Sequence, residues 1–550
     1  MLSSSISSRT FSMAYSIQAE AARVLEEHLL NNKALDIPAS FREAAKKVKF
    51  VGDSTPFIPT PLKITESSSA LNALVGVIAS AVSKDRYGVG HQEVTVDTDV
   101  ASLFLMSIIL PTVGGTPALA HPVIAKELAK ADLYDMQKPI HRQCTNVYQT
   151  KDGRWFHLHG SMNAGPSMQM VGVPEQDITH EEAQKIYMDK VAQWESEEID
   201  RVANEKYRQA GVICNTPEEF FASEHGQIMG KEPLYTLRPR SAPRKAWPAT
   251  TDPSRPLAGI RVIDFSRVIA APVISKMLAA LGAEVLKVTW ENLPDIAVTW
   301  VELSTGKRDT NLDLKSEDGR KKLSELVESA DVLIDGYRPG VLAKLGFDAE
   351  SLRKINPSLI YVRENCYGWK GPLSYRSGWQ QISDCLVGIS WLQGKFLGLN
   401  EPVVPLLPNS DYQMGLVGAA AVSHALLLRT QSDTTFDVDV SLTQYNIWYY
   451  RLGEQTPEIQ RALRAQHKDL HLRHYDEMNS LITKTFATVK QARPDLFQRP
   501  EYFDTMSGKE WGIDEDISIL TTPFKLEKSV LKYDTPSGRR GRSEAKWVSA

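Results

Sequence analysis

Regular alternation of strand-like and helix-like segments from Gly259 to Asn365 constrains the fold of this chain more than any other feature. Short apolar runs typical of buried strands alternate with longer stretches whose apolar residues recur at helical spacing. The strand-like runs are GIRVIDFS, EVLKVTW, DVLIDGY and LIYVREN, and the helical stretches include AAPVISKMLAALGA, GRKKLSELVESA and AESLRKIN. Strands and helices that alternate in this way form parallel sheets covered by helices. The pattern therefore predicts an α/β fold for the second half of the chain.

An internal repeat links the two halves of the chain. Residues 72–104 and 414–446 align without a gap, and both contain the tripeptide LVG followed later by the dipeptide VD. Each copy begins with an Ala-rich helical stretch and passes through polar residues into an alternating strand. We interpret the match as a partial duplication of a helix, turn and strand unit, with chance similarity as the alternative.

The predicted domain boundaries follow from a Pro- and Arg-rich stretch, RPRSAPRKAWPATTDPSRP, which lacks apolar periodicity as linkers do. Before it, NVYQTKDGRWFHLHG predicts a hairpin with an Asp-Gly turn, and residues 180–211 predict a helix, together a smaller α+β domain. The predicted organisation is an N-terminal extension (1–50), a partial repeat with the small domain (51–240), a linker (241–256), the main α/β domain with the second repeat helix (257–455) and a C-terminal helical and return segment (456–550).

Composition argues against several classes of protein. A formal net charge of -4 provides no basic field for nucleic acid or an anionic membrane. No apolar run reaches the ~18 residues that would span a bilayer, so no membrane partner is expected. The four cysteines lie far apart without a CxxC pair, which argues against a disulfide framework or a zinc site. A cytoplasmic location is predicted; mitochondrial import is the alternative, because the first dozen residues are Ser-rich, carry Arg9 and lack acids.

Four ordered stretches of the second half resemble the class III CoA-transferase (CaiB/BaiF) family. They are PLAGIRVIDFSRVIAAPVISKMLAALGAEVLKV, TGKRDTNLDLKSEDGR, ADVLIDGYRPGVLAKLGF and NPSLIYV, and the resemblance covers about residues 256–450. It implies a Rossmann-like CoA-transferase domain, a coenzyme A thioester as substrate with no permanently bound cofactor, a carboxylic acid as acceptor, and a homodimer. VYQTKDGRWFHL and YRQAGVICNTPEEFFASEHGQ more faintly resemble the small domain of the family. Because they precede the main domain, the chain resembles a rearranged or truncated tandem of a fungal type.

Asp411, in NSDYQMGLVG, falls just before the predicted second repeat helix, where the helix dipole favours an anion. From the residues alone, an aspartate at this place is most simply an N-cap. The resemblance implies instead that Asp411 is the nucleophile, which attacks the thioester carbonyl and later carries CoA as an aspartyl thioester. The aligned position in the first repeat is Ser69, so the first copy is expected to lack the nucleophile.

The resemblance also implies a CoA site in the main domain. The phosphates of CoA require cations and helix N-termini, and its adenine requires a slot for a planar ring. A GxGxxG loop is missing from this sequence, which argues against NAD. For any single cation a solvated surface charge is the alternative, so the residues are treated as a set. Those at matching positions are Arg267, Val268, Ile269, Ala270, Leu312, Lys315, Gly336, Tyr337, Arg338 and Lys344.

Departures from the family pattern keep alternatives open. Trp379 and Gln380 stand where related α-methylacyl-CoA racemases carry a GHD motif, and Gln380 also replaces an aspartate usual in transferases. The glycine-rich loop of some members has only a weak counterpart, VGGT at 113–116. The sequence predicts an enzyme that moves CoA between an acyl-CoA and a carboxylic acid. The alternatives are a catalytically silent CoA-thioester binding protein, and an acyl-CoA epimerase or lyase in which Asp411 acts as a base.

Overall fold

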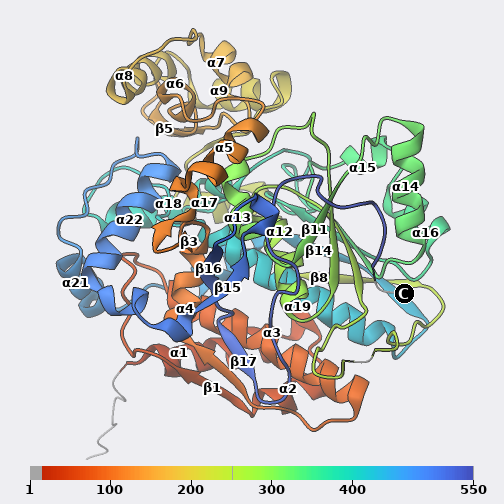
Figure 1. Ribbon diagram of the computed structural model, residues 1–550. Helices are drawn as coiled ribbons and strands as arrows, with labels where there is room; N and C mark the ends of the chain where they lie inside the picture. The colour runs from red at the N-terminus through yellow and green to blue at the C-terminus, as the bar shows by residue number, and fades with distance from the viewer. Residues whose placement is uncertain (1–14, 251, 549–550) are drawn as a thin grey trace, which may run out of the picture.

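A seven-stranded sheet forms the centre of the second half in the computed structural model, which describes residues 15–250 and 252–548 (Figure 1). The first dozen residues, on which the alternative of mitochondrial import depends, lie outside the described residues. Neighbouring strands are parallel except β8, which pairs antiparallel with β14 at one edge. The predicted α/β fold with a parallel sheet is therefore confirmed. In spatial order the strands are β11 (Lys307–Asn311), β10 (Glu284–Thr289), β9 (Arg261–Phe265), β12 (Val332–Asp335), β13 (Ile360–Asn365), β14 (Thr434–Ser441) and β8 (Thr236–Ser241).

Both faces of this sheet are covered, as its continuous apolar strands require. On one face, the amphipathic helices α14 (Glu317–Glu328) and α16 (Ala349–Ile355) pack in a core with Ile263, Leu286 and Leu333. On the other face, α12 (Ala270–Ala280) is buried along its whole length between the sheet and α19 (Asn409–Arg429). Successive residues of β9 point to opposite faces of the sheet, so Val262 packs in one core and Ile263 in the other.

The two repeat copies have equivalent surroundings in the structure. Their helices pack against each other, and the strand of each copy lies in its own sheet. Helix α3 (Ile64–Tyr87) packs against α19, and its own strand β2 (Val94–Asp97) lies between the parallel β1 (Val48–Val51) and the antiparallel β17 (Phe524–Leu526). Strand β14 likewise lies between the parallel β13 and the antiparallel β8. The similarity thus extends to neighbouring strands whose sequences do not align. Part of the stretch interpreted as linker, residues 238–241, belongs to β8.

The small domain stands apart at the top of Figure 1 and has its own apolar core. The predicted hairpin is present as β5 (Asn146–Gln149) and β6 (Trp155–Leu158), joined to β7 (Gly211–Ile213). The single helix predicted over 180–211 is wrong, because the structure has α8 (His180–Val191) and α9 (Ser196–Arg201) separated by a turn. Asp152 accepts hydrogen bonds from the Ser196 N–H (3.2 Å) and hydroxyl (2.6 Å), which fixes the new helix start.

The C-terminal segment returns across the first half of the chain. Helices α21 (Pro457–Gln466) and α22 (Met478–Ala492) precede β15 (Phe503–Ser507) and β16 (Asp516–Leu520), which join a short hairpin of β3 (Thr112–Val113) and β4 (Thr116–Pro117). Gly114 and Gly115, with φ of 56° and 82°, form its tight turn. The VGGT segment is thus a hairpin turn. Among the helices of the described residues, none is long and apolar enough to cross a membrane.

Candidate active site

Two adjoining cavities lie at the carboxyl ends of the parallel strands, where open α/β sheets bind their ligands. The first has a volume of about 440 Å³ and the second about 90 Å³. Asp411 and all ten residues predicted to bind CoA line one or both. The first cavity holds Leu312, Lys315 and Lys344; the second holds Val268, Ile269, Ala270, Gly336 and Asp411; Arg267, Tyr337 and Arg338 line both.

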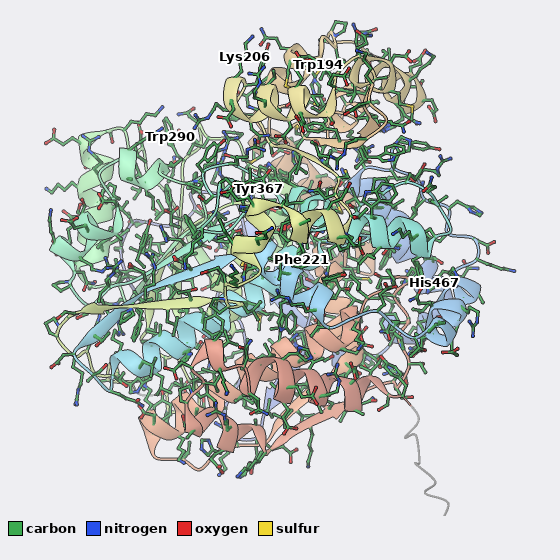
Figure 2. The ribbon with its side chains drawn as sticks, turned by 180° about the vertical axis from the view of Figure 1, so that it is seen from behind. Trp194, Lys206, Phe221, Trp290, Tyr367 and His467 are labelled. Atoms are coloured by element: carbon green, nitrogen blue, oxygen red, sulfur yellow. The ribbon has the colours of Figure 1, made fainter. Side chains whose placement is uncertain are left out.

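The first cavity combines unpaired cations with aromatic rings. The Arg267 guanidinium lies 4.4 Å from the centre of the Tyr337 ring, which stacks on Phe265 with the ring centres 4.2 Å apart. Lys315 Nζ lies 5.3 Å from the centre of the Trp290 ring. Figure 2 shows Trp290 on the rim of the larger domain, with Trp194 marking the small domain above it.

Four cations and one carboxylate, that of Asp313, line this cavity. Within the described residues, no carboxylate lies within ion-pair distance of the cationic groups that line it, namely Arg267, Lys315, Arg338 and Lys344. A cavity of this kind can hold a polyanion that carries a planar ring.

The second cavity contains the Asp411 side chain. Helix α19 begins at Asn409, so Asp411 is its third residue, and the N-cap is Pro408, which makes no side-chain capping bond. The N-cap interpretation of Asp411 is therefore wrong, because the helix starts earlier than the sequence predicted. Among residues 15–250 and 252–548, none forms a hydrogen bond or ion pair with the Asp411 carboxyl, which is partly exposed toward the cavity. This carboxyl is available to a ligand.

Acidic neighbours destabilise the charged form of Asp411. Burial raises the pKa of Asp411 well above its usual range, and the negative charges of Glu364 and Asp384 raise it further. Burial also raises the pKa of Glu364 to about 8, with a further contribution from Asp335. Such a cluster of perturbed carboxyls in a cavity is typical of a catalytic site. A carboxylate with little solvation is also a stronger nucleophile than one in water.

The turn between β9 and α12 reaches the same cavity. Val268 has a φ of 68°, in the left-handed region that a β-branched residue rarely adopts. Such strain is often found at ligand sites. Helix α12 then begins at Ala270 without a side-chain cap, and the first N–H groups of a helix have no partner within it. The turn can therefore provide backbone donors to an oxyanion formed next to Asp411.

Several residues of the cavities were missed by the sequence analysis. Ser161, Met162 and Asn163 come from the small domain, and Met162 lines both cavities. Their sequence gives no signal, because the cavities join them to segments that lie far away in the chain, from Arg267 to Asp411. Glu364 carried a signal that was overlooked, namely a charged residue at the end of the apolar strand LIYVREN.

Gln380 and Ser69 lie away from these cavities. The Gln380 amide donates to Asp384 (3.0 Å) and to the Leu407 carbonyl (2.9 Å), so its side chain is part of a buried network. Ser69 is buried in α3, and no described residue forms a hydrogen bond with its hydroxyl.

The fold and the site together define an α/β enzyme with an anion-binding cavity next to an available carboxylate. The sequence profile of the family described as CoA-transferase family III matches residues 257–492. The protein named acetyl-coenzyme A transferase nodX, from Hypoxylon pulicicidum, is 36% identical over 96% of this chain and 93% of its own length. An acyl-CoA transferase from Gibberella moniliformis is 32% identical over 73% of each chain. A solved CaiB/BaiF family protein from Brucella suis aligns with a TM-score of 0.38 at 20% identity, over 52% of this chain and 97% of its own.

This chain belongs to CoA-transferase family III. It is a CoA-transferase that uses a coenzyme A thioester as substrate. The prediction of an enzyme of this family from the sequence is confirmed.

Proposed function

We propose that the chain moves CoA from an acyl-CoA to a carboxylic acid through a covalent intermediate on Asp411. The observation that carries the proposal is the unpaired Asp411 carboxyl in a cavity that adjoins the cation-lined one. The Asp411 carboxylate attacks the thioester carbonyl, and the tetrahedral adduct expels CoA thiolate to leave an acyl anhydride on Asp411. The thiolate then attacks the Asp411 carbonyl and releases the donor acid as its carboxylate.

The second half of the cycle repeats these steps with the acceptor. The acceptor carboxylate attacks the aspartyl-CoA thioester and expels the thiolate, which returns to the acceptor carbonyl of the new anhydride. Asp411 leaves as a carboxylate, so no proton is gained or lost. The backbone groups at the turn before α12 stabilise the oxyanion of each tetrahedral intermediate.

The two cavities have different roles in this proposal. Arg267, Arg338, Lys315 and Lys344 hold the phosphates of CoA, and the ring of the adenine lies against the aromatic side chains. The second cavity, at about 90 Å³, suits a short acyl group. The name of the Hypoxylon relative, an acetyl-coenzyme A transferase, agrees with a small donor.

A single chain supplies both sides of this site, since the small domain comes from the first half and Asp411 from the second. The homodimer that the family resemblance implies is then not needed to complete the site. Transfer activity per chain is expected to be independent of protein concentration, which activity measurements over a dilution series, combined with light scattering, would check.

Mass spectrometry of the trapped intermediate tests the proposal. The protein is incubated with short, branched and dicarboxylic acyl-CoAs, quenched with hydroxylamine or borohydride, and compared with Asp411→Ala and the isosteric Asp411→Asn. We expect a mass change in the wild type that maps to Asp411 and is missing from both variants. CoA binding without modification by any donor would support a silent binding protein instead. Solvent deuterium at the substrate α-carbon would support an epimerase or lyase in which Asp411 is a base.

A further inference from the structure

Glu364 is a second available carboxyl in the cavity that contains Asp411. It lies near the carboxyl end of β13, beside Val440 of β14, and its side chain is 9% exposed. Both Glu364 and Asp411 line the second cavity. In the described part of the chain, no donor or cation lies within hydrogen-bond or ion-pair distance of the Glu364 carboxyl.

The other two acids of the cluster are satisfied by the protein. Asp335 accepts hydrogen bonds from the Tyr361 hydroxyl (2.7 Å) and the Tyr337 N–H (3.2 Å). Asp384 accepts from three side chains, those of Gln380, Ser410 and Asn446. Structural roles therefore account for these two carboxyls but not for Glu364, which is buried at the site without a protein partner.

The groups around Glu364 disfavour two negative charges in the cavity. Asp335 acts on Glu364 from β12, and Glu364 and Asp411 of α19 act on each other. Asp384 of α17 (Gln380–Val387) acts on Asp411, and the Cys366 thiol lies close to all three of Glu364, Asp384 and Asp411. The cations on the cavity wall are Arg267, Arg338 and Arg376, of which Arg376 is paired with Asp200 at 2.8 Å. Two carboxyls that share an enclosed site titrate as a pair and retain one proton over a wide pH range.

Reactivity decides which member of the pair carries that proton in the working enzyme. Asp411 must be ionised to attack, so the productive form has its proton on Glu364. Burial raises the pKa of both carboxyls, so the reaction and not burial selects this arrangement.

We propose that Glu364, in its neutral form, is the residue that binds the carboxyl group of the acid substrate, by donating a hydrogen bond to it next to Asp411. The inference rests on the proposed transferase function. The acceptor binds as a carboxylate while Asp411 carries CoA as a thioester, and a neutral O–H donor stabilises that carboxylate, whereas an ionised Glu364 would repel it. No bond to Glu364 forms or breaks, and its proton stays in place throughout the cycle.

Two substitutions separate the donor from the ionisable group. Glu364→Gln keeps a hydrogen-bond donor and cannot ionise, whereas Glu364→Leu removes the donor at similar volume. For each we would measure the trapped adduct formed from acyl-CoA alone, the KM for the acceptor acid, and kcat/KM for that acid from pH 6 to pH 9.

We expect Glu364→Gln to keep the acceptor KM within about threefold and to lose the alkaline decline that the wild type shows as Glu364 ionises. We expect Glu364→Leu to raise the acceptor KM about tenfold or more, while Asp411 is still modified by acyl-CoA. A wild-type acceptor KM in the Leu variant, or an unchanged alkaline decline in the Gln variant, would overturn the inference.

If the melting temperature shows that the Leu variant is unfolded, the pH profile of the Gln variant decides alone. Failure of the transferase proposal itself is distinct, because the wild type would then form no adduct.

Discussion

The Asp384 carboxylate accepts a 3.0 Å hydrogen bond from the hydroxyl of Ser410, the residue that directly precedes Asp411. The side-chain amides of Asn446 (2.8 Å) and Gln380 (3.0 Å) donate to the same carboxylate. These partners come from α17, α19 and α20 (Leu442–Arg451). The buried network therefore fixes the start of the helix that carries the proposed nucleophile.

We predict that Asp384→Asn lowers both stability and the rate of Asp411 modification, because an amide cannot accept from three donors without leaving one unpaired. The free energy of unfolding should fall by about 1–3 kcal/mol in urea titrations. Ser410→Ala, which removes one donor, should cost only about 0.5–1.5 kcal/mol. Equal stability of Asp384→Asn and the wild type would show that the network does not hold the helix.

The elements that surround this network were predictable, whereas the network was not. Strands such as Val332–Asp335 and helix α12 have apolar patterns that local sequence determines. The bonds of Asp384 join three segments that only the tertiary fold brings together. For the same reason Gln380 was interpreted as a departure at the substrate, although its amide is buried against Asp384.

The start of α19 shows a second limit of sequence reasoning. The Ala-rich stretch predicted a helix beginning after Asp411, and Asn409 and Ser410 are themselves weak helix formers. Tertiary bonds outweigh that preference, since the Asn409 amide donates to the Tyr445 hydroxyl (3.1 Å) and Ser410 to Asp384. The CoA-site residues could be identified as a set only through the resemblance, because they come from several segments that are far apart in the chain.

Close packing of α19 against α12 gives the second prediction. A Cβ added at Gly415 would lie 2.4 Å from Val273 Cγ1 and 3.0 Å from the Ala270 carbonyl oxygen. We expect Gly415→Ala to destabilise the fold by about 1–3 kcal/mol and to slow Asp411 modification, because it displaces Asp411 from the turn at 268–270. Gly90→Ala is the matched control, since its Cβ meets no atom within 4 Å. Similar effects of both substitutions on modification would contradict this account.

The unpaired cations give the third prediction. Lys344→Met should weaken CoA binding about tenfold, measured by calorimetry, and should reduce the dependence of affinity on salt. Lys354→Met, on the neighbouring α16, removes an exposed lysine outside both cavities and should leave binding unchanged. If both variants bind CoA equally well at low and high salt, Lys344 does not contact a phosphate.

A buried ion pair below the site gives the fourth prediction. Lys307 Nζ lies 2.9 Å from Asp264 Oδ2, and both side chains are 0% exposed. Lys307→Met would leave a buried carboxylate without its counter-charge, and we expect a loss of about 3–5 kcal/mol in unfolding free energy. Lys321→Met, whose side chain is 75% exposed in the wild type, should change stability by less than about 0.5 kcal/mol. A loss below about 1 kcal/mol for Lys307→Met would mean that Asp264 is neutral in the folded protein.

The pH dependence of stability tests the protonation of Glu364 without any substrate. Burial raises the pKa of Glu364 from 4.5 to about 8. Between these values the folded protein holds a proton that the unfolded chain has lost, so this group makes stability fall as the pH rises from about 4.5 to about 8. Glu364→Gln removes that contribution and should be more stable than the wild type at pH 7, by up to about 3 kcal/mol.

Urea unfolding of both proteins at several pH values from 5 to 8 gives the dependence of unfolding free energy on pH for each. Glu350→Gln, whose side chain is 83% exposed, is the control for a surface acid. Parallel slopes for the wild type and Glu364→Gln would mean that Glu364 is ionised in the folded state, and the proton shared in the cavity would then lie on Asp411.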